Sequence, residues 1–181
     1  MHERRFHGDI ARLRNPDRIA RLEVARVVDL ACAGVKEIHS VLDIGTGTGL
    51  FAEEFAARGV TLTGVDANPE MIAAARQFVP AGDFKLGIAE QLPISGTTFD
   101  VVFMGLVLHE ADEPLQALQE AFRVCAQRLA VLEWPYRAQD FGPGLVERIP
   151  PAQMETWSQT LGFKQLRWTE LKEVTLYCFD K

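Results

Sequence analysis

The sequence predicts an α/β fold: a Rossmann-like, doubly wound, seven-stranded sheet that is mostly parallel and ends in an antiparallel C-terminal hairpin. Short apolar runs alternate with helix-prone segments, and strands joined by helical crossovers lie parallel. A glycine-rich turn separates the first apolar run from a helical segment, as at a nucleotide-binding strand–loop–helix unit. A turn too short for a helix separates the last two β-rich runs, which are therefore antiparallel.

The elements follow from hydrophobic periodicity and from start and stop signals. Residues 1–15 have no clear periodicity and are expected to form an arm. A capping side chain before a proline, Asn15-Pro16, then begins an amphipathic helix over 16–33. The arm and helix, residues 1–35, are expected to form a lid. The expected strands are 40–44, 61–65, 83–87, 99–104, 129–134, 163–169 and 173–179, and the later helices are 49–58, 68–78, 113–125 and 151–161.

Composition narrows the class of protein. The length suits a single domain over 1–181. No apolar run approaches the roughly 18 residues of a membrane helix, and the charged N-terminus is unlike a secretory signal, so we expect a cytoplasmic protein without membrane insertion. A net charge of −6 disfavours nucleic acid as a partner. The N-terminal arginines alternate with acids and are expected to form a solvated face. The dispersed Cys32, Cys125 and Cys178 predict buried small side chains and no metal site.

The glycine-rich turn is the strongest functional signal. Glycines stand at Gly45, Gly47 and Gly49, where they let the backbone approach a bulky ligand. Asp66 closes the next strand, where an acid accepts hydrogen bonds from the hydroxyls of a ribose. Leu50 occupies the position of the third glycine of a dinucleotide fingerprint, which disfavours a nicotinamide cofactor, as does the lack of a Tyr-x-x-x-Lys pair. An adenosine-containing cofactor of another kind is indicated.

Four segments in order resemble the motifs of the class I S-adenosylmethionine-dependent methyltransferases. They are 43–49, 64–71, 86–93 and 99–109. Within this family the chain resembles small enzymes allied to the ubiquinone and menaquinone biosynthesis methyltransferases. The residues that carry this resemblance are Arg5-Phe6-His7, Asn15-Pro16-Asp17-Arg18, Glu133-Trp134 and 142–148. Two departures stand out: Ile88 replaces the usual adenine-binding acid, and the turn 124–128 before the fifth strand is shorter than the family's.

The resemblance implies a set of cofactor-binding residues. In it Asp43 attracts the amino group of the cofactor, Asp66 binds the ribose, and Ala89 offers a backbone N–H to the adenine. Asp43 is also interpretable as a helix cap, and Met71 equally as ordinary core. With Ile88 in place of an acid, Glu90, a backbone carbonyl or water must accept from the adenine amino group. The full set is Asp43, Gly45, Thr46, Gly47, Gly49, Asp66, Ala67, Met71, Ala89, Glu90 and Gly105.

The acceptor side has weaker signals. His109 follows the fourth strand and is either a general base or a side chain that packs the loop. Glu133 ends the fifth strand and either binds the acceptor or pairs with an arginine. Further polar candidates are His7, Glu110, Tyr136 and Arg137, and possible aromatic walls are Trp134, Tyr136, Phe141 and Trp157.

The sequence therefore predicts an S-adenosylmethionine-dependent methyltransferase acting on a small molecule, because no segment is left over for a separate substrate-recognition domain. The alternative is a non-catalytic S-adenosylmethionine-binding sensor or an inactive partner subunit, since no unmistakable catalytic residue is present. Monomer and homodimer both remain open.

Overall fold

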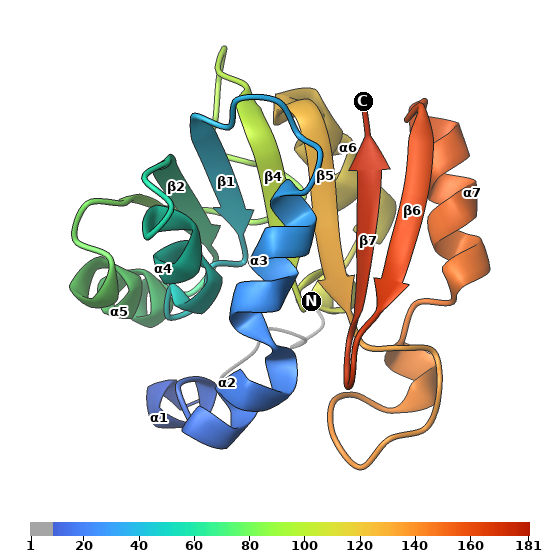
Figure 1. The fold of residues 1–181 in the computed structure, drawn as a ribbon, viewed down its shortest axis with the longest axis horizontal. Coiled ribbons are helices and arrows are strands. Elements are labelled where there is room, and N and C mark those ends of the chain that lie inside the picture. The colour runs from blue at the N-terminus through green and yellow to red at the C-terminus, as the bar shows by residue number, and fades with distance from the viewer. Residues whose placement is uncertain (1–8) are drawn as a thin grey trace.

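The computed structural model describes residues 9–181 and contains one seven-stranded sheet, with strand order β3-β2-β1-β4-β5-β7-β6 (Figure 1). β7 is antiparallel to both of its neighbours, and the other pairs are parallel, so the predicted mostly parallel sheet with a C-terminal hairpin is confirmed. The strands are β1 (Ser40–Ile44), β2 (Thr61–Asp66), β3 (Asp83–Leu86), β4 (Phe99–Gly105), β5 (Cys125–Glu133), β6 (Gln165–Glu170) and β7 (Thr175–Asp180).

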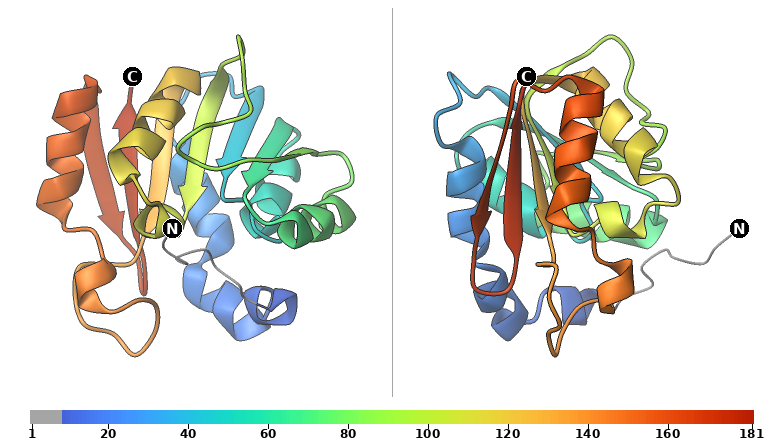
Figure 2. Two further views of the ribbon diagram at one scale, coloured as in Figure 1. Left: turned by 180° about the vertical axis from the view of Figure 1, so that it is seen from behind. Right: turned by 90° about the vertical axis from the view of Figure 1, so that its right-hand side faces the viewer.

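Helices cover both faces of the sheet (Figure 2). One hydrophobic cluster joins the sheet to the first face, and another joins it to the second. The first face carries α3 (Val24–Cys32), α4 (Leu50–Ala56) and α5 (Pro69–Phe78); the second carries α6 (Pro114–Val124) and α7 (Pro151–Leu161). At one end lie α1 (Ile10–Leu13), α2 (Pro16–Leu22) and the short helices η1 (Leu108–Glu110) and η2 (Leu145–Glu147).

Strand β4 shows why the sheet is double-sided. Val101 and Phe103 belong to the cluster on the α3 face, whereas Val102 and Met104 belong to the cluster on the α6 face. All four are fully buried, as expected for a central parallel strand whose successive side chains point to opposite faces. Residues 101–104 are therefore an apolar run without a polar face, and they hold the polar residues that follow the strand at a fixed edge.

The predicted helix over 16–33 is in fact two helices. Glu23 interrupts it with a left-handed backbone (φ 49°) between α2 and α3. Its carboxylate accepts from the backbone N–H of Lys172 (3.0 Å) in the β6–β7 turn and pairs with Arg26 (2.7 Å). These contacts compensate the unfavourable backbone conformation. The break turns α2 toward the carboxyl ends of the strands, and a further short helix, α1, lies within the expected arm.

The short turn that was expected before β5 does not form. Helix α6 ends at Val124 and β5 begins at Cys125, four residues earlier than the predicted 129. Cys125 and Cys178 are buried, which raises the pKa of their thiols to about 12 and about 11. Cys32 is half-buried, so it matches the expected burial only in part. Among the described helices, none has the length and apolar character needed to cross a membrane.

Candidate active site

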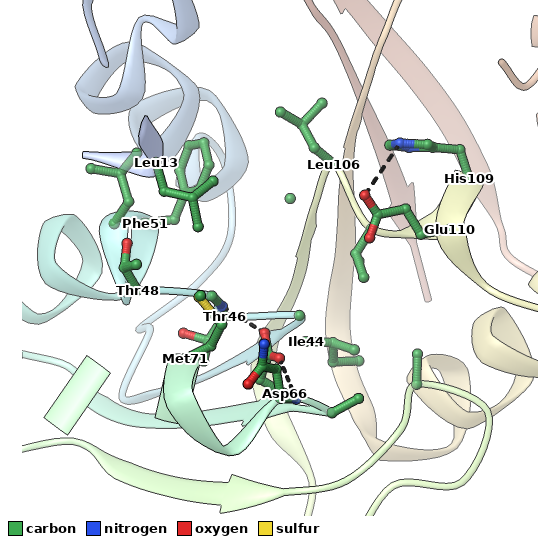
Figure 3. Close-up of a pocket in the computed structure, with 18 of the residues that line it drawn as sticks. Leu13, Ile44, Thr46, Thr48, Phe51, Asp66, Met71, Leu106, His109 and Glu110 are labelled. Carbon is green, nitrogen blue, oxygen red and sulfur yellow. Dashed lines mark hydrogen bonds and ion pairs between the residues drawn. The ribbon is translucent and has the colours of Figure 1, made fainter. Parts of the chain in front are cut away.

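A cavity of about 1060 Å³ opens at the carboxyl edge of the sheet, around the neighbouring ends of β1 and β4. At this point the strand order reverses, and open α/β sheets bind their ligands there. The volume matches the upper end of small-molecule sites, about 1,000 Å³. Figure 3 shows side chains from β1, β2, α1, α4 and the segment after β4 lining it.

The turn between β1 and α4 supplies the backbone wall of the cavity. Gly45 and Gly47 have positive φ values of 69° and 53°, which L-residues with a Cβ adopt only with strain. The N–H groups of Gly45 and Thr46 donate to the carbonyl of Val65 (2.8 and 3.0 Å), which fixes the turn to β2. A Cβ on Gly45 would lie 2.5 Å from the side chain of Val107, so the turn also depends on glycine for space.

Asp66 links the turn to the end of β2. One carboxylate oxygen accepts from the N–H of Gly47 (2.8 Å) and the other from the N–H of Asn68 (2.8 Å). Burial raises the pKa of Asp66, although these N–H groups act in the opposite direction. The carboxylate lies in the wall of the cavity, and it also holds the glycine turn in place.

Two of the predicted cofactor residues do not line the cavity. Asp43 is 2% exposed, behind the turn, where it accepts from the Thr46 hydroxyl (2.7 Å) and from the N–H of Ala52 in the first turn of α4. Burial raises its pKa to about 7. Gly49 precedes α4 with φ 77°, and its Cα faces Ala75 of α5. The structure therefore favours the capping interpretation of Asp43 and a packing role for Gly49.

The other nine predicted residues do line the cavity; they are Gly45, Thr46, Gly47, Asp66, Ala67, Met71, Ala89, Glu90 and Gly105. Met71 is 3% exposed, so it belongs to the core and to the cavity wall. Glu90 accepts from the backbone N–H of Asp112 (2.9 Å). That bond holds the segment after β3 against the start of α6.

The opposite wall contains a histidine–glutamate pair. Nδ1 of His109 lies 2.8 Å from Glu133 Oε2, and the backbone N–H of His109 donates to Oε1 of the same carboxylate (3.2 Å). Glu133 is 1% exposed, whereas His109 lines the cavity. Burial lowers the pKa of His109, but the charge and hydrogen bond of Glu133 outweigh it and raise that pKa. The expected pairing of Glu133 with an arginine is wrong, because its partner is His109.

The loop 134–148 also contributes to the cavity wall. Arg148 is 4% exposed and donates to the carbonyls of Pro135, Arg137, Phe141 and Pro143 and to the side chain of Gln139, at 2.6–3.0 Å. Of the predicted aromatic walls, Trp134 and Phe141 line the cavity, whereas Tyr136 and Trp157 do not. Glu110 also lines it, and Arg137 instead contacts Glu170 (3.8 Å). His7 and the Arg5-Phe6-His7 motif lie outside the described residues.

The sequence analysis expected a lid over 1–35 but did not predict that arginines of α1 and α2 line the cavity. Arg12, Arg18 and Arg21 were expected on a solvated face, but they line the cavity, and Arg21 lies over the Phe141 ring (4.8 Å to its centroid). Leu106, directly after β4, was also missed; it lines the cavity with a left-handed backbone (φ 60°). The arginines alternate with acids in the sequence, a pattern typical of a solvated face, so their position in the cavity was not predicted. No local sequence rule predicts a leucine with a left-handed backbone.

Comparison with known proteins agrees with this geometry. Residues 42–128 match the family model of a methyltransferase domain. The demethylmenaquinone methyltransferase of Chlorobaculum parvum is 38% identical over 85 residues, 46% of this chain and 35% of that protein. The malonyl-[acyl-carrier protein] O-methyltransferase of Serratia marcescens is 37% identical over 86 residues, 48% of this chain and 34% of that protein. The chain thus spans about a third of these relatives' length.

Solved structures share the fold over nearly the whole chain. A SAM-dependent methyltransferase from Aquifex aeolicus has a TM-score of 0.78 at 24% identity and covers 94% of this chain and 95% of its own. CalS10, an amino pentose methyltransferase from Micromonospora echinaspora solved with bound SAM, has a TM-score of 0.80 at 18% identity, with 100% of both chains covered. Residues 42–128 thus resemble a methyltransferase domain, and the fold is that of solved S-adenosylmethionine-dependent methyltransferases.

The cavity suits the cofactor of that class, S-adenosylmethionine. It offers a carboxylate in the wall at Asp66, an open backbone at Gly47, and apolar surface at Met71, Ile88 and Leu106. A molecule with hydroxyl groups, two cationic centres and an adenine ring finds complementary groups along this wall.

Proposed function

We propose that this chain transfers a methyl group from S-adenosylmethionine to a small-molecule acceptor bound in the same cavity. The single observation that carries the proposal is that the carboxylate of Asp66 and the backbone of Gly47, hydrogen-bonded to one another, share a wall of the cavity with Ala89 and Glu90. An acid, an open glycine backbone and a short apolar segment at the switch point of the sheet are the groups that an adenosine-containing ligand needs.

We propose these roles for the cavity residues. Asp66 accepts hydrogen bonds from the ribose hydroxyls, while Ala67, Met71 and Ala89 contact the adenine. Asp43 acts through Thr46, because its carboxylate is buried behind the turn and bonded to that hydroxyl. When bound, S-adenosylmethionine supplies a methyl group that the positive charge of its sulfur activates. The protein then has to orient the acceptor and exclude water.

A small acceptor is supported by how the remaining space is enclosed. Three segments far apart in the sequence close the acceptor side: α1 and α2, the segment after β4, and the loop 134–148. Glu23 fixes α2 to the β6–β7 turn, and Arg148 holds the loop 134–148 together from within. Relatives are named for acceptors as different as demethylmenaquinone and a malonyl group on a carrier protein, and closing segments of this kind set acceptor specificity.

The test combines binding with transfer. Calorimetry should show that Asp66→Ala weakens S-adenosylmethionine binding by about 100-fold, since hydrogen bonds to a charged group contribute about 1.5–3 kcal/mol. Asp83→Ala, an exposed acid in the neighbouring strand β3, is the matched control and should bind normally. Equal affinity of Asp66→Ala and the unmodified chain would contradict the ribose contact.

Transfer is measured with donor labelled in the methyl group and offered with a metabolite extract. We expect label in a small product with the unmodified chain, and little with Asp66→Ala. Tight binding without transferred label in any extract would instead favour the non-catalytic sensor or inactive subunit.

A further inference from the structure

We infer that the acceptor reacts through a hydroxyl oxygen, and that His109 removes its proton while the buried Glu133 positions His109. The inference rests on the proposed function and names the chemical class of its acceptor. It follows from three observations: the fixed orientation of the imidazole, the charges around it, and the apolar surface beside it.

The orientation of the imidazole is fixed from behind. Glu133, at the end of β5, holds both the side chain of His109 (Nδ1, 2.8 Å) and its backbone N–H (3.2 Å), and accepts a third bond from the N–H of Trp134 (3.3 Å). A carboxylate so bonded keeps the proton of a neutral imidazole on Nδ1. Nε2 is therefore the acceptor atom of a ring that lines the cavity.

The charges around His109 favour its protonated form. Glu133 faces the ring from β5, Glu110 from η1 with Oε1 at 3.8 Å from Nε2, and Glu147 acts from η2. Burial raises the pKa of the Tyr177 phenol in β7 to about 12, and the charge of Glu133 acts in the same direction. A proton arriving on Nε2 is thus stabilised by acids on three elements. His109 is therefore a stronger base than a free histidine.

A base is needed only when the acceptor enters protonated at its reacting atom. A neutral hydroxyl that loses its proton to His109 leaves an oxyanion beside an imidazolium, an opposite-charge pair that the buried Glu133 helps to form. An ammonium acceptor that gave its proton to His109 would become a neutral amine. No pair of opposite charges would then form beside the imidazolium. Trp134, Leu106 and Val107 supply apolar cavity surface in the adjoining segments, which suits a phenolic or enolic hydroxyl.

The reaction balances with groups already named. The acceptor O–H bond breaks and its proton goes to Nε2 of His109; the oxygen lone pair forms the new O–CH₃ bond. The S–CH₃ bond of the donor breaks with its electron pair left on sulfur, which becomes a neutral thioether. His109 returns its proton to water after release of the methyl ether.

The first test needs no acceptor. Histidine ¹⁵N and ¹³C shifts of the full chain are followed against pH, with the exposed His39 as internal reference. We expect the pKa of His109 to lie above that of a free histidine, and His109 to carry its proton on Nδ1 when neutral. Glu133→Gln should lower the pKa of His109. A neutral His109 protonated on Nε2, or a pKa of His109 below that of a free histidine, would overturn the inference.

The second test uses the product formed from labelled donor and metabolite extract. Mass spectrometry should place the label on oxygen. His109→Gln should lower kcat by about 100- to 10,000-fold and remove the acidic limb of the pH–rate profile. Glu133→Gln should keep the limb but shift it to lower pH, an effect that loss of packing alone does not produce. His39→Gln is the matched control, with unchanged rate and profile.

The outcomes separate the two proposals. Label on carbon, nitrogen or sulfur, or a His109→Gln profile identical to that of the unmodified chain, overturns the hydroxyl inference and leaves methyl transfer standing. No labelled product from the unmodified chain, with His109 titrating as expected, overturns the proposed function instead.

Discussion

The cavity has two halves that the chain builds in different ways. The half that we propose for the cofactor comes from consecutive strand ends over 44–90, and it is built on positive-φ glycines and on the carboxylate of Asp66, which accepts from the N–H of Gly47. The half that we propose for the acceptor comes from 12–22, 106–116, 134–143 and Glu173, and it uses side chains that meet only in the folded state. The family model matches the first half, within residues 42–128, whereas most of the second half lies outside that match.

The largest contrast should come from one matched pair of glycines. Gly45 (φ 69°) and Gly142 (φ 78°) are both crowded, since a Cβ would lie 2.5 Å from Val107 and 2.6 Å from Trp134, respectively. Strain and overpacking should cost each alanine variant about 2–5 kcal/mol of stability. We expect Gly45→Ala to lose S-adenosylmethionine binding by at least about 100-fold, through displacement of the turn.

Gly142→Ala should bind S-adenosylmethionine normally and lose transfer to the acceptor. Calorimetry and the labelled-donor assay, run on both variants below their melting temperatures, measure the two effects. If both variants lost cofactor affinity equally, the division into halves would be wrong.

The same division decides what the sequence predicts. The strands near the cofactor half were predicted to within a residue or so, because Val41–Ile44 and the glycine spacing are local signals. The break at Glu23 depends on the N–H of Lys172, which lies 149 residues away. The pairing of His109 with Glu133 joins η1, after β4, to the end of β5. Such contacts follow from the sheet order and register, which local periodicity does not give.

Arg148 tests the acceptor half alone. Its guanidinium fills the loop 134–148 with five hydrogen bonds, so Arg148→Met leaves those acceptors to water and frees the loop. We expect faster hydrogen exchange and proteolysis within 136–147 and an acceptor KM raised about tenfold, a loss of about 1.4 kcal/mol. The control, Arg167→Met, removes an exposed arginine that pairs with Asp180 in the hairpin. Weaker cofactor binding in Arg148→Met would place the loop in both halves.

Asp43 gives the cofactor half a pH dependence. Its folded pKa of about 7 lies above the ordinary 3.8, so its proton stabilises the ligand-free fold fully below about 3.8 and progressively less as the pH rises through 7. A cationic ligand beyond the turn favours the charged carboxylate and releases this proton. S-adenosylmethionine affinity should therefore rise a few-fold between about pH 6 and about pH 8, with at most tenfold per pH unit.

Calorimetry in two buffers of different ionisation enthalpy measures that proton release. Asp43→Asn, which keeps an oxygen for the Thr46 hydroxyl, should bind with an affinity that no longer changes with pH. An unaltered pH dependence in this variant would assign the proton to another group, with Asp66 the first candidate because burial raises its pKa too.

The smallest effect on binding should come from within the glycine turn itself. Gly49 has φ 77° and a Cβ position 3.3 Å from the Cα of Ala75, yet it does not line the cavity; Gly47 has φ 53°, an open Cβ position, and does. Gly49→Ala should cost about 1–3 kcal/mol of stability and leave S-adenosylmethionine affinity unchanged. Gly47→Ala introduces a similar backbone strain, but it should also weaken binding, because its methyl group enters the cavity. Thermal unfolding and calorimetry on the two variants separate the loss of stability from the loss of affinity. Equal losses of affinity would mean that the turn responds as a unit. The burial of Asp43 behind the turn would then contribute to binding through the position of every glycine.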